Sequence, residues 1–313
     1  MTKKIALAGL ILGFIPGCMQ LSQKPLVKRI NLKTSAPIAT SIDATTNFAQ
    51  NPPITIWIHG TRLLPKGMFQ KFFYSKPGLH HYATIDPKFH LHKIAATLSA
   101  SDPYLFPAQT FYLFGWSGML SFKEREIAAR RFYDELKLLR LEYVASYGHE
   151  PEIRIICHSH GGNIALLLEK VKDPADVSFF VKDLILLACP VQTQTMEYAS
   201  APLFGKVYSL YSILDVMQVV DPQGLQKEDN SQHVPLFSQR FFPHNEKIEQ
   251  VAIKKNDRSL MHIEFVQLQF LAQIPQILAE IESWHTSTKA PDWHCRDKCL
   301  CINTKSANKF ALH

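Results

Sequence analysis

Residues 154–170 read RIICHSHGGNIALLLEK. An apolar run leads into Ser159, two histidines flank the serine, and a glycine pair precedes a helix-like run. The pattern predicts a strand, a tight turn and a helix, with Ser159 exposed in the turn. Such a turn strains the serine backbone, so its neighbours must be small, and the usual glycine two positions before it is replaced by the small Cys157. Ser159 is therefore a candidate nucleophile.

Outward from this stretch, apolar runs alternate with segments of helical periodicity. We expect strands at 54–63, 110–116, 153–157, 183–190, 206–212 and 250–255, and helices at 122–148, 161–171 and 262–284. Strands that are apolar throughout and alternate with helices predict an α/β fold with a mostly parallel central sheet covered on both faces. Residues 26–32 could add a strand to the sheet edge, and 62–107 reads as a long irregular stretch.

The N-terminus has the pattern of an export signal. Residues 1–17 hold two lysines and an apolar stretch too short to span a membrane, followed directly by Cys18. This pattern resembles the lipobox of bacterial lipoproteins, which implies lipidation of Cys18 and a membrane-anchored protein of the bacterial cell envelope. Pro16 departs from the lipobox pattern, and a plain signal peptide or an uncleaved anchor is the alternative.

The domain organisation follows from these segments. We expect a signal peptide at 1–17, a tether at 18–53, one domain at 54–285 with insertions at 62–107 and 222–247, and a polar, cysteine-containing tail at 286–313.

Composition narrows the function classes. The chain has 313 residues, of which 46% are hydrophobic and 19% charged, and this is the composition of a folded, globular protein. The formal charge of +7 is spread along the chain without the basic stripe of a nucleic-acid binder. His294, Cys295, Cys299 and Cys301 crowd the tail, but their spacing does not match a zinc site, so free thiols or a tail disulfide are the stronger alternatives. No metal site is expected.

The sequence HSHGGNIAL after an apolar strand, with IWIHGT about a hundred residues earlier, resembles the α/β-hydrolase superfamily, in particular its lipases and esterases. The similarity covers residues 54–284. It implies an oxyanion hole formed by the backbone N–H groups of Thr61, or alternatively Arg62, and of His160. It also implies that no cofactor is needed.

The same resemblance gives the order of the two remaining catalytic groups, an acid followed by a histidine. Asp215 lies shortly after the strand at 206–212 and is favoured over Asp221 as the acid. His262 follows the last strand and is the expected base. The implied activity is cleavage of carboxylic esters through a Ser159–Asp215–His262 triad.

Alternatives stay open at this level. Ser117 in FGWSG lacks a following helix, and the Cys157 side chain should point into the sheet, so neither is the expected nucleophile. Aromatic residues beside Lys and Arg in the two insertions favour a lipid or phospholipid acyl ester as substrate, although they could simply pack onto the core. A catalytically silent lipoprotein that acts as a binding or envelope module, or an acyltransferase with the same triad, are the competing functions.

Overall fold

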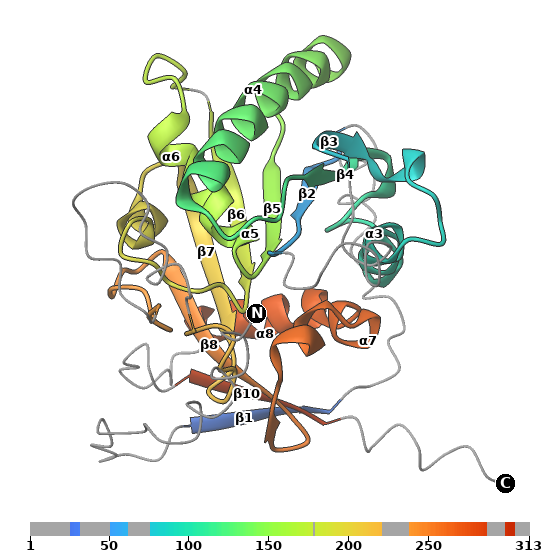
Figure 1. The fold of residues 1–313 in the computed structure, drawn as a ribbon. Helices are drawn as coiled ribbons and strands as arrows, with labels where there is room; N and C mark the ends of the chain where they lie inside the picture. Colours follow the sequence, from blue (N-terminus) through green and yellow to red (C-terminus); the bar gives the residue numbers. More distant parts are fainter. Residues whose placement is uncertain are drawn as a thin grey trace, which may run out of the picture.

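The computed structural model describes residues 26–31, 51–61, 76–177, 179–220, 238–286 and 298–303, and one sheet runs through them. Its strands are β1 (Leu26–Asn31), β2 (Ile54–Ile58), β3 (Gly78–His81), β4 (Phe111–Gly115), β5 (Ile153–His158), β6 (Val181–Leu187), β7 (Phe204–Tyr211), β8 (Ile248–Lys255), β9 (Arg258–Ser259) and β10 (Lys298–Asn303). The order across the sheet is β1-β10-β8-β7-β6-β5-β2-β4-β3, and β9 pairs with β8 (Figure 1).

All neighbouring strands of the described sheet run parallel except the pairs β3–β4 and β8–β9. A parallel sheet brings the carboxyl ends of its strands to one edge, and in this class of fold ligands bind at that edge. The loops after β2, β5, β7 and β8 therefore decide the site.

The helices are α3 (His90–Ser101), α4 (Phe122–Tyr147), α5 (Gly161–Leu166), α6 (Leu168–Val171), α7 (Leu268–Leu271) and α8 (Ile274–Thr286). Helix α4 begins where the Ser121 side chain accepts a hydrogen bond from the Glu124 N–H, and it ends at Gly148, whose φ of 79° suits glycine. Both ends agree with the sequence-based prediction.

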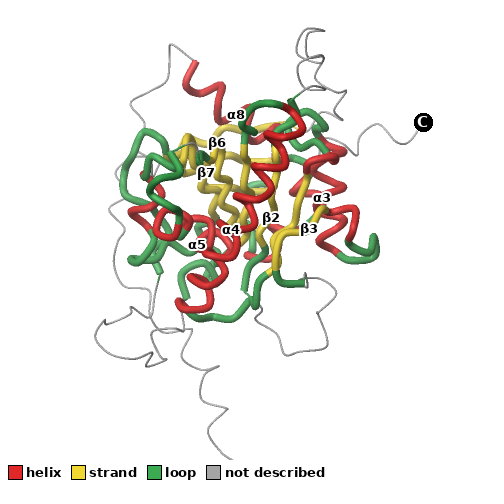
Figure 2. The backbone as a smooth tube through the Cα atoms, turned by 90° about the horizontal axis from the view of Figure 1, so that it is seen from above, coloured by secondary structure: helices red, strands yellow, loops and turns green. Residues whose placement is uncertain are grey.

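Two apolar clusters occupy the two faces of the sheet. Ile56 and Ile155 pack with residues of α4, α5 and α6, while Trp57 and Ile156 pack with residues of α3, α7 and α8. Successive residues of one strand thus enter opposite clusters, which is why these strands are apolar throughout. Figure 2 shows the strands enclosed by helices. The predicted fold class, α/β with a mostly parallel sheet covered on both faces, is confirmed.

Three segments differ from the prediction. Residues 78–101, expected to be irregular, contain β3 and α3. The predicted helix 262–284 is divided into a 3₁₀ turn at His262–Val266 and the helices α7 and α8. Residues 298–303, expected in a polar tail outside the core, form β10 between β1 and β8, with Leu300 fully buried. The edge strand considered for residues 26–32 is present as β1.

Several predicted features lie outside the described residues: the signal peptide at 1–17, Cys18, most of the tether, Arg62, Asp221 and Cys295. In the part of the chain that the structure describes, no helix is both long and apolar enough to cross a bilayer. Cys299 and Cys301 are buried and carry thiols rather than a disulfide.

Candidate active site

Ser159 occupies a strained turn between β5 and α5. Its φ of 54° lies in the left-handed region, which costs a non-glycine residue about 1–3 kcal/mol unless the surroundings hold it there. The holding contacts are backbone hydrogen bonds: Ser159 N–H donates to Leu187 O at 2.9 Å, and Gly162 N–H donates to Ser159 O at 3.0 Å. The predicted strand–turn–helix around Ser159 is thus what the chain forms.

Two glycines allow the end of β2 to approach this turn closely. A Cβ on Gly60 would lie 2.8 Å from the Cβ of Ser159, and a Cβ on Gly161 would lie 2.7 Å from the carbonyl oxygens of Ile58 and His59. Neither position therefore accepts a larger residue without backbone movement. The His59–Gly60 turn, predicted to serve the site, lies directly against the serine.

The Ser159 side chain is more buried than is expected for a residue in a surface turn. Ser159 is 7% exposed, whereas the sequence suggested an exposed side chain. The reason is the same close packing, since Gly60 and the buried His158 lie beside it.

Asp215 and His262 come together although 47 residues separate them. The His262 Nδ1–H donates to Asp215 Oδ2 at 2.8 Å. Asp215 lies in the loop after β7, and His262 opens the 3₁₀ turn that follows β9. The second carboxylate oxygen, Oδ1, accepts the Gln218 N–H at 3.2 Å. With both oxygens occupied, the carboxylate is fixed in orientation and directs Nε2 of His262 away from itself.

The His262 ring contacts His158, the residue that precedes Ser159. The rings of His158 and His262 lie 4.7 Å apart between centroids, and His158 Nε2 lies 3.2 Å from the His262 carbonyl oxygen. Because a carbonyl only accepts, His158 carries its proton on Nε2. Among the hydrogen bonds of the described residues there is none from Ser159 Oγ to His262. Such bonds are often long in a free enzyme and tighten with substrate.

The histidines beside the serine are held neutral. Burial lowers the pKa of His158 well below its ordinary value, and the nearby His262 and His59 add to the effect. Burial likewise lowers the pKa of His160, with the Arg125 charge as the next cause. A neutral His158 avoids a second positive charge beside His262.

Of the two predicted oxyanion donors, His160 is next to Ser159 in sequence, and Thr61 is next to Gly60, which lies close to the serine. The Thr61 hydroxyl is buried and has no hydrogen-bond partner among the described residues. The turn before Thr61 is fixed by Trp116, whose backbone N–H donates to His59 Nε2 at 3.3 Å and whose Nε1–H donates to His59 O at 2.8 Å.

The residues rejected as nucleophiles lie where the sequence suggested. Cys157 is fully buried in the cluster beneath α4–α6, and burial raises the pKa of its thiol well above the ordinary value. The Ser117 hydroxyl accepts a hydrogen bond from the Met119 N–H within its own loop.

Sequence reasoning missed Gln218 and Arg240, both of which support the Asp215 loop. Arg240 Nη1 donates to the carbonyl oxygens of Ser212 and Asp215. No sequence signal identifies them, because their partners are mostly main-chain atoms of residues far away in the chain.

Exposed apolar side chains, called the apolar rim below, lie on the loops that carry Asp215 and His262. The loops that carry these two residues, together with the loop after β4, present a set of exposed apolar side chains: Met119, Ile213, Leu214, Val216, Met217, Val220, Met261 and Ile263. Leu214 is 72% exposed and Met261 is 65% exposed. Apolar side chains gathered at a functional edge mark a surface that meets apolar material.

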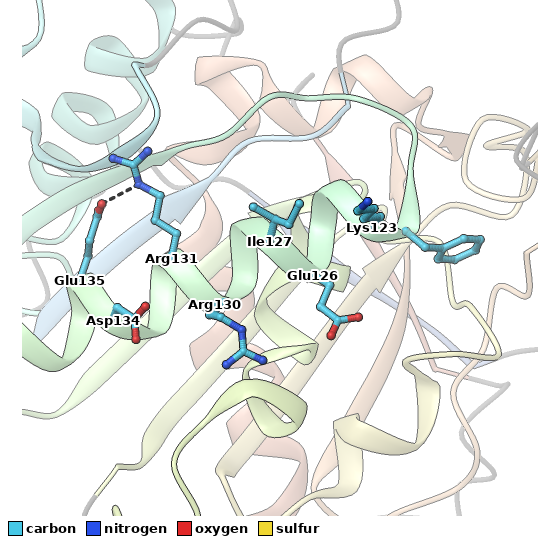
Figure 3. A pocket seen from close by; sticks show the side chains of 8 residues that line it. Lys123, Glu126, Ile127, Arg130, Arg131, Asp134 and Glu135 are labelled. Atoms are coloured by element: carbon cyan, nitrogen blue, oxygen red, sulfur yellow. Dashed lines mark hydrogen bonds and ion pairs between the residues drawn. The ribbon is translucent and has the colours of Figure 1, made fainter. Parts of the chain in front are cut away.

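A depression of about 860 Å³ lies elsewhere, along the outer face of α4 (Figure 3). It is lined by Phe122, Lys123, Glu126, Ile127, Arg130, Arg131, Asp134 and Glu135. Three basic and three acidic side chains balance, and Arg131 pairs with Glu135 at 2.7 Å. None of the predicted site residues lines it, so this solvated helix face is not the candidate active site. No group of His, Cys, Asp and Glu within the described ranges is arranged to hold a metal ion.

No protein-family model matches the sequence, and no curated protein matches it significantly. A hormone-sensitive lipase from a metagenome library matches over 45% of this chain and 38% of the lipase, with 16% identity and a TM-score of 0.26. An α/β serine hydrolase homologue from Coxiella burnetii matches over 53% and 64%, with 14% identity and a TM-score of 0.31. An arylesterase matches over 81% and 67%, with 12% identity and a TM-score of 0.33.

These solved structures are hydrolases, and the chain spans less than two thirds of the first two. The candidate chemistry rests on the geometry of this chain: a strained serine, a hydrogen-bonded Asp215–His262 pair, and an apolar rim at the carboxyl edge of the sheet.

Proposed function

We propose that this protein is a serine hydrolase that cleaves carboxylic esters through Ser159, Asp215 and His262. The observation that carries the proposal is the 2.8 Å hydrogen bond from His262 Nδ1–H to Asp215 Oδ2, with the His262 ring packed against the residue that precedes the strained Ser159. A histidine oriented by a buried carboxylate beside a serine is the arrangement that activates a hydroxyl for attack on a carbonyl.

The reaction proceeds in two halves. Ser159 Oγ attacks the ester carbonyl carbon while His262 Nε2 takes its proton, and Asp215 stabilises the resulting imidazolium. His262 then gives the proton to the departing alkoxide as the ester C–O bond breaks, which leaves an acyl group on Ser159. A water molecule attacks the acyl carbonyl in the same way and releases the acid. The N–H groups of His160 and Thr61 receive the oxyanion, each contributing about 3 kcal/mol in comparable sites.

The apolar rim favours an acyl ester with an apolar chain, including lipid or phospholipid esters. Leu214 and Met261 are exposed and lie next to Asp215 and His262 in sequence, so they are available to contact an apolar part of the substrate. Burying an apolar chain against them gains about 25 cal/mol per Å². A small polar ester would gain little from this surface.

The membrane is the proposed setting for this reaction. The Cys18 lipobox resemblance carries this part of the proposal, and a diacyl anchor would hold the apolar rim within reach of a bilayer.

Ester hydrolysis by matched variants tests the proposal. We expect Ser159→Ala and Asp215→Asn each to lower kcat by about 10⁴-fold or more on a long-chain acyl ester. Ser117→Ala is the control, because Ser117 lies on another loop and should keep wild-type activity. Wild-type activity in Ser159→Ala would overturn the proposal, as would loss of activity in Ser117→Ala alone.

A further inference from the structure

The loop that carries Asp215 lacks the apolar packing that fixes most of the chain. Ile213 is 51% exposed, Leu214 72%, Val216 51% and Met217 46%. Side chains that point into solvent contribute no burial energy, so they do not hold the loop in one conformation. Yet the carboxylate must stay within hydrogen-bonding distance of His262.

A polar anchor lies beneath this loop. Nη1 of Arg240 donates to Ser212 O at 2.5 Å, to Asp215 O at 2.8 Å and to Gln218 Oε1 at 3.3 Å. These three acceptors span the whole loop, from the end of β7 to the residue that binds the carboxylate. One charged donor thus fixes the two ends and the middle of the segment.

Gln218 extends the anchor into the core. It is fully buried, and its Nε2–H donates to Cys189 O at 2.9 Å, beyond the end of β6. Its own backbone N–H donates to Asp215 Oδ1. The carboxylate, Gln218, Arg240 and the carboxyl end of β6 therefore form one connected network.

Arg240 is itself held in place. The preceding residue, Gln239, forms a pair of backbone hydrogen bonds with Val191, at 2.8 and 3.0 Å. The guanidinium meets the main-chain oxygen of Asp215, whereas both carboxylate oxygens are used by Gln218 and His262. The cation therefore supports the loop without competing with His262 for the carboxylate.

We propose that Arg240 is a positioning residue, which holds the loop from Ser212 to Gln218 so that the Asp215 carboxylate reaches His262 Nδ1. The role rests on the proposed triad, and Arg240 acts through Asp215 without touching substrate. Displacing a catalytic group by about 1 Å can cost about 100-fold in rate. Losing the anchor should therefore lower reactivity at Ser159 although the triad itself is unchanged.

The test uses the full chain and two readouts. The first is the rate of Ser159 labelling by a fluorophosphonate probe, which needs no knowledge of the substrate. The second is the proton NMR signal of the His262 Nδ1–H, which reports its hydrogen bond to Asp215 directly. We expect Arg240→Met to label about 100-fold more slowly and to lose the proton signal. Arg240→Lys should recover most of both, because all three contacts use a single nitrogen.

Two further variants keep the test decisive. Arg131→Met removes an arginine of equal size from an ion pair on the outer face of α4 and should match the wild type in both readouts. Gln218→Met leaves Arg240 and the Gln218 N–H in place and should label about 10-fold more slowly, as expected for the loss of one or two hydrogen bonds. If Arg240→Met does not fold, Arg240→Lys and Gln218→Met carry the test.

The outcomes separate this inference from the proposed function. Wild-type labelling and an unchanged proton signal in Arg240→Met, or in Gln218→Met when Arg240→Met does not fold, would overturn the positioning role while leaving the triad intact. A wild type that resists the probe would contradict the triad. In that case the proton signal alone decides whether Arg240 positions Asp215, since it does not depend on catalysis.

Discussion

At the scale of single residues, the strained Ser159 lies beside two histidines, His59 and His158, whose tautomers are fixed by the backbone. His59 Nε2 accepts the Trp116 N–H, so its Nδ1–H donates to Gly60 O at 2.8 Å and the ring is neutral. His158 donates to the His262 carbonyl oxygen. Each ring thus has a backbone partner that fixes its tautomer, and together they brace the turn at Gly60 and the start of the 3₁₀ turn at His262.

The buried histidines make stability depend on pH. The pKa of His158 and that of His160 are lowered by burial in the folded chain, whereas both side chains take up protons below about pH 6.5 when unfolded. The unfolded state then binds more protons, so stability is fully present above pH 6.5 and falls as the pH drops below it. The slope is up to about 1.4 kcal/mol per pH unit for each proton.

Denaturant unfolding at a series of pH values from 8 to 5 measures this slope. His158→Gln retains an N–H donor for the His262 carbonyl. It should reduce the dependence of stability on pH by the contribution of one proton, up to about 1.4 kcal/mol per pH unit. Leu138→Ala, at an exposed position on α4, is the control and should leave the slope unchanged, because leucine binds no proton. An unaltered slope in His158→Gln would contradict the account of a buried neutral ring.

At the scale of elements, the sequence predicts the strands that are buried on both faces of the sheet. Short apolar runs bounded by turns are typical of buried strands, and this pattern predicted the strands β2, β5, β6, β7 and β8. The turn at Ser159 was predicted from the strand–turn–helix pattern, and the family resemblance gave the order of Asp215 and His262 along the chain. The role of Arg240 was not predicted, because its acceptors are backbone carbonyls and the side chain of Gln218, which leave no pattern in the sequence.

Strand β10 escaped prediction for a related reason. Its six residues contain only four that are apolar, and polar residues flank them in the sequence. Leu300 and Ile302 are buried against β8 and β1, an environment that only the assembled sheet creates.

A buried β10 predicts that the C-terminal segment stabilises the domain. Leu300→Ala should lower the free energy of unfolding by about 2–5 kcal/mol, measured by denaturant unfolding. Leu138→Ala is the control, because Leu138 is 61% exposed on α4 and its loss should change little. Equal stability of Leu300→Ala and the wild type would show that the strand does not contribute to the fold.

The exposed apolar side chains on the loops that carry Asp215 and His262 predict a preference for esters with long acyl chains. Leu214→Ser and Met261→Ser should reduce activity several-fold on dispersed long-chain esters, because the rim loses contact with the acyl chain. Activity on a soluble acetyl ester should stay near the wild-type value, since that substrate is too short to reach these side chains. If both variants lose activity equally on both esters, the rim is not a binding surface for the acyl chain.

At the scale of the whole molecule, the proposed anchor and the apolar rim would act together. Because β1 begins at Leu26, only residues 19–25 separate Cys18 from the sheet, and a lipid on Cys18 would hold the domain close to the bilayer. We expect Cys18→Ser to move the protein from the membrane fraction to the soluble fraction, as measured by fractionation and immunoblotting. Wild-type membrane association in Cys18→Ser would contradict lipid anchoring at this residue.

Labelling by a fluorophosphonate probe, with the adduct located by mass spectrometry, determines whether Ser159 is the nucleophile. The probe reacts only with a serine that an adjacent base has activated. We expect stoichiometric modification of Ser159 in the wild type, none in Ser159→Ala, and modification slowed by orders of magnitude in His262→Ala. A wild type that stays unlabelled, or an adduct on another serine, would contradict this assignment.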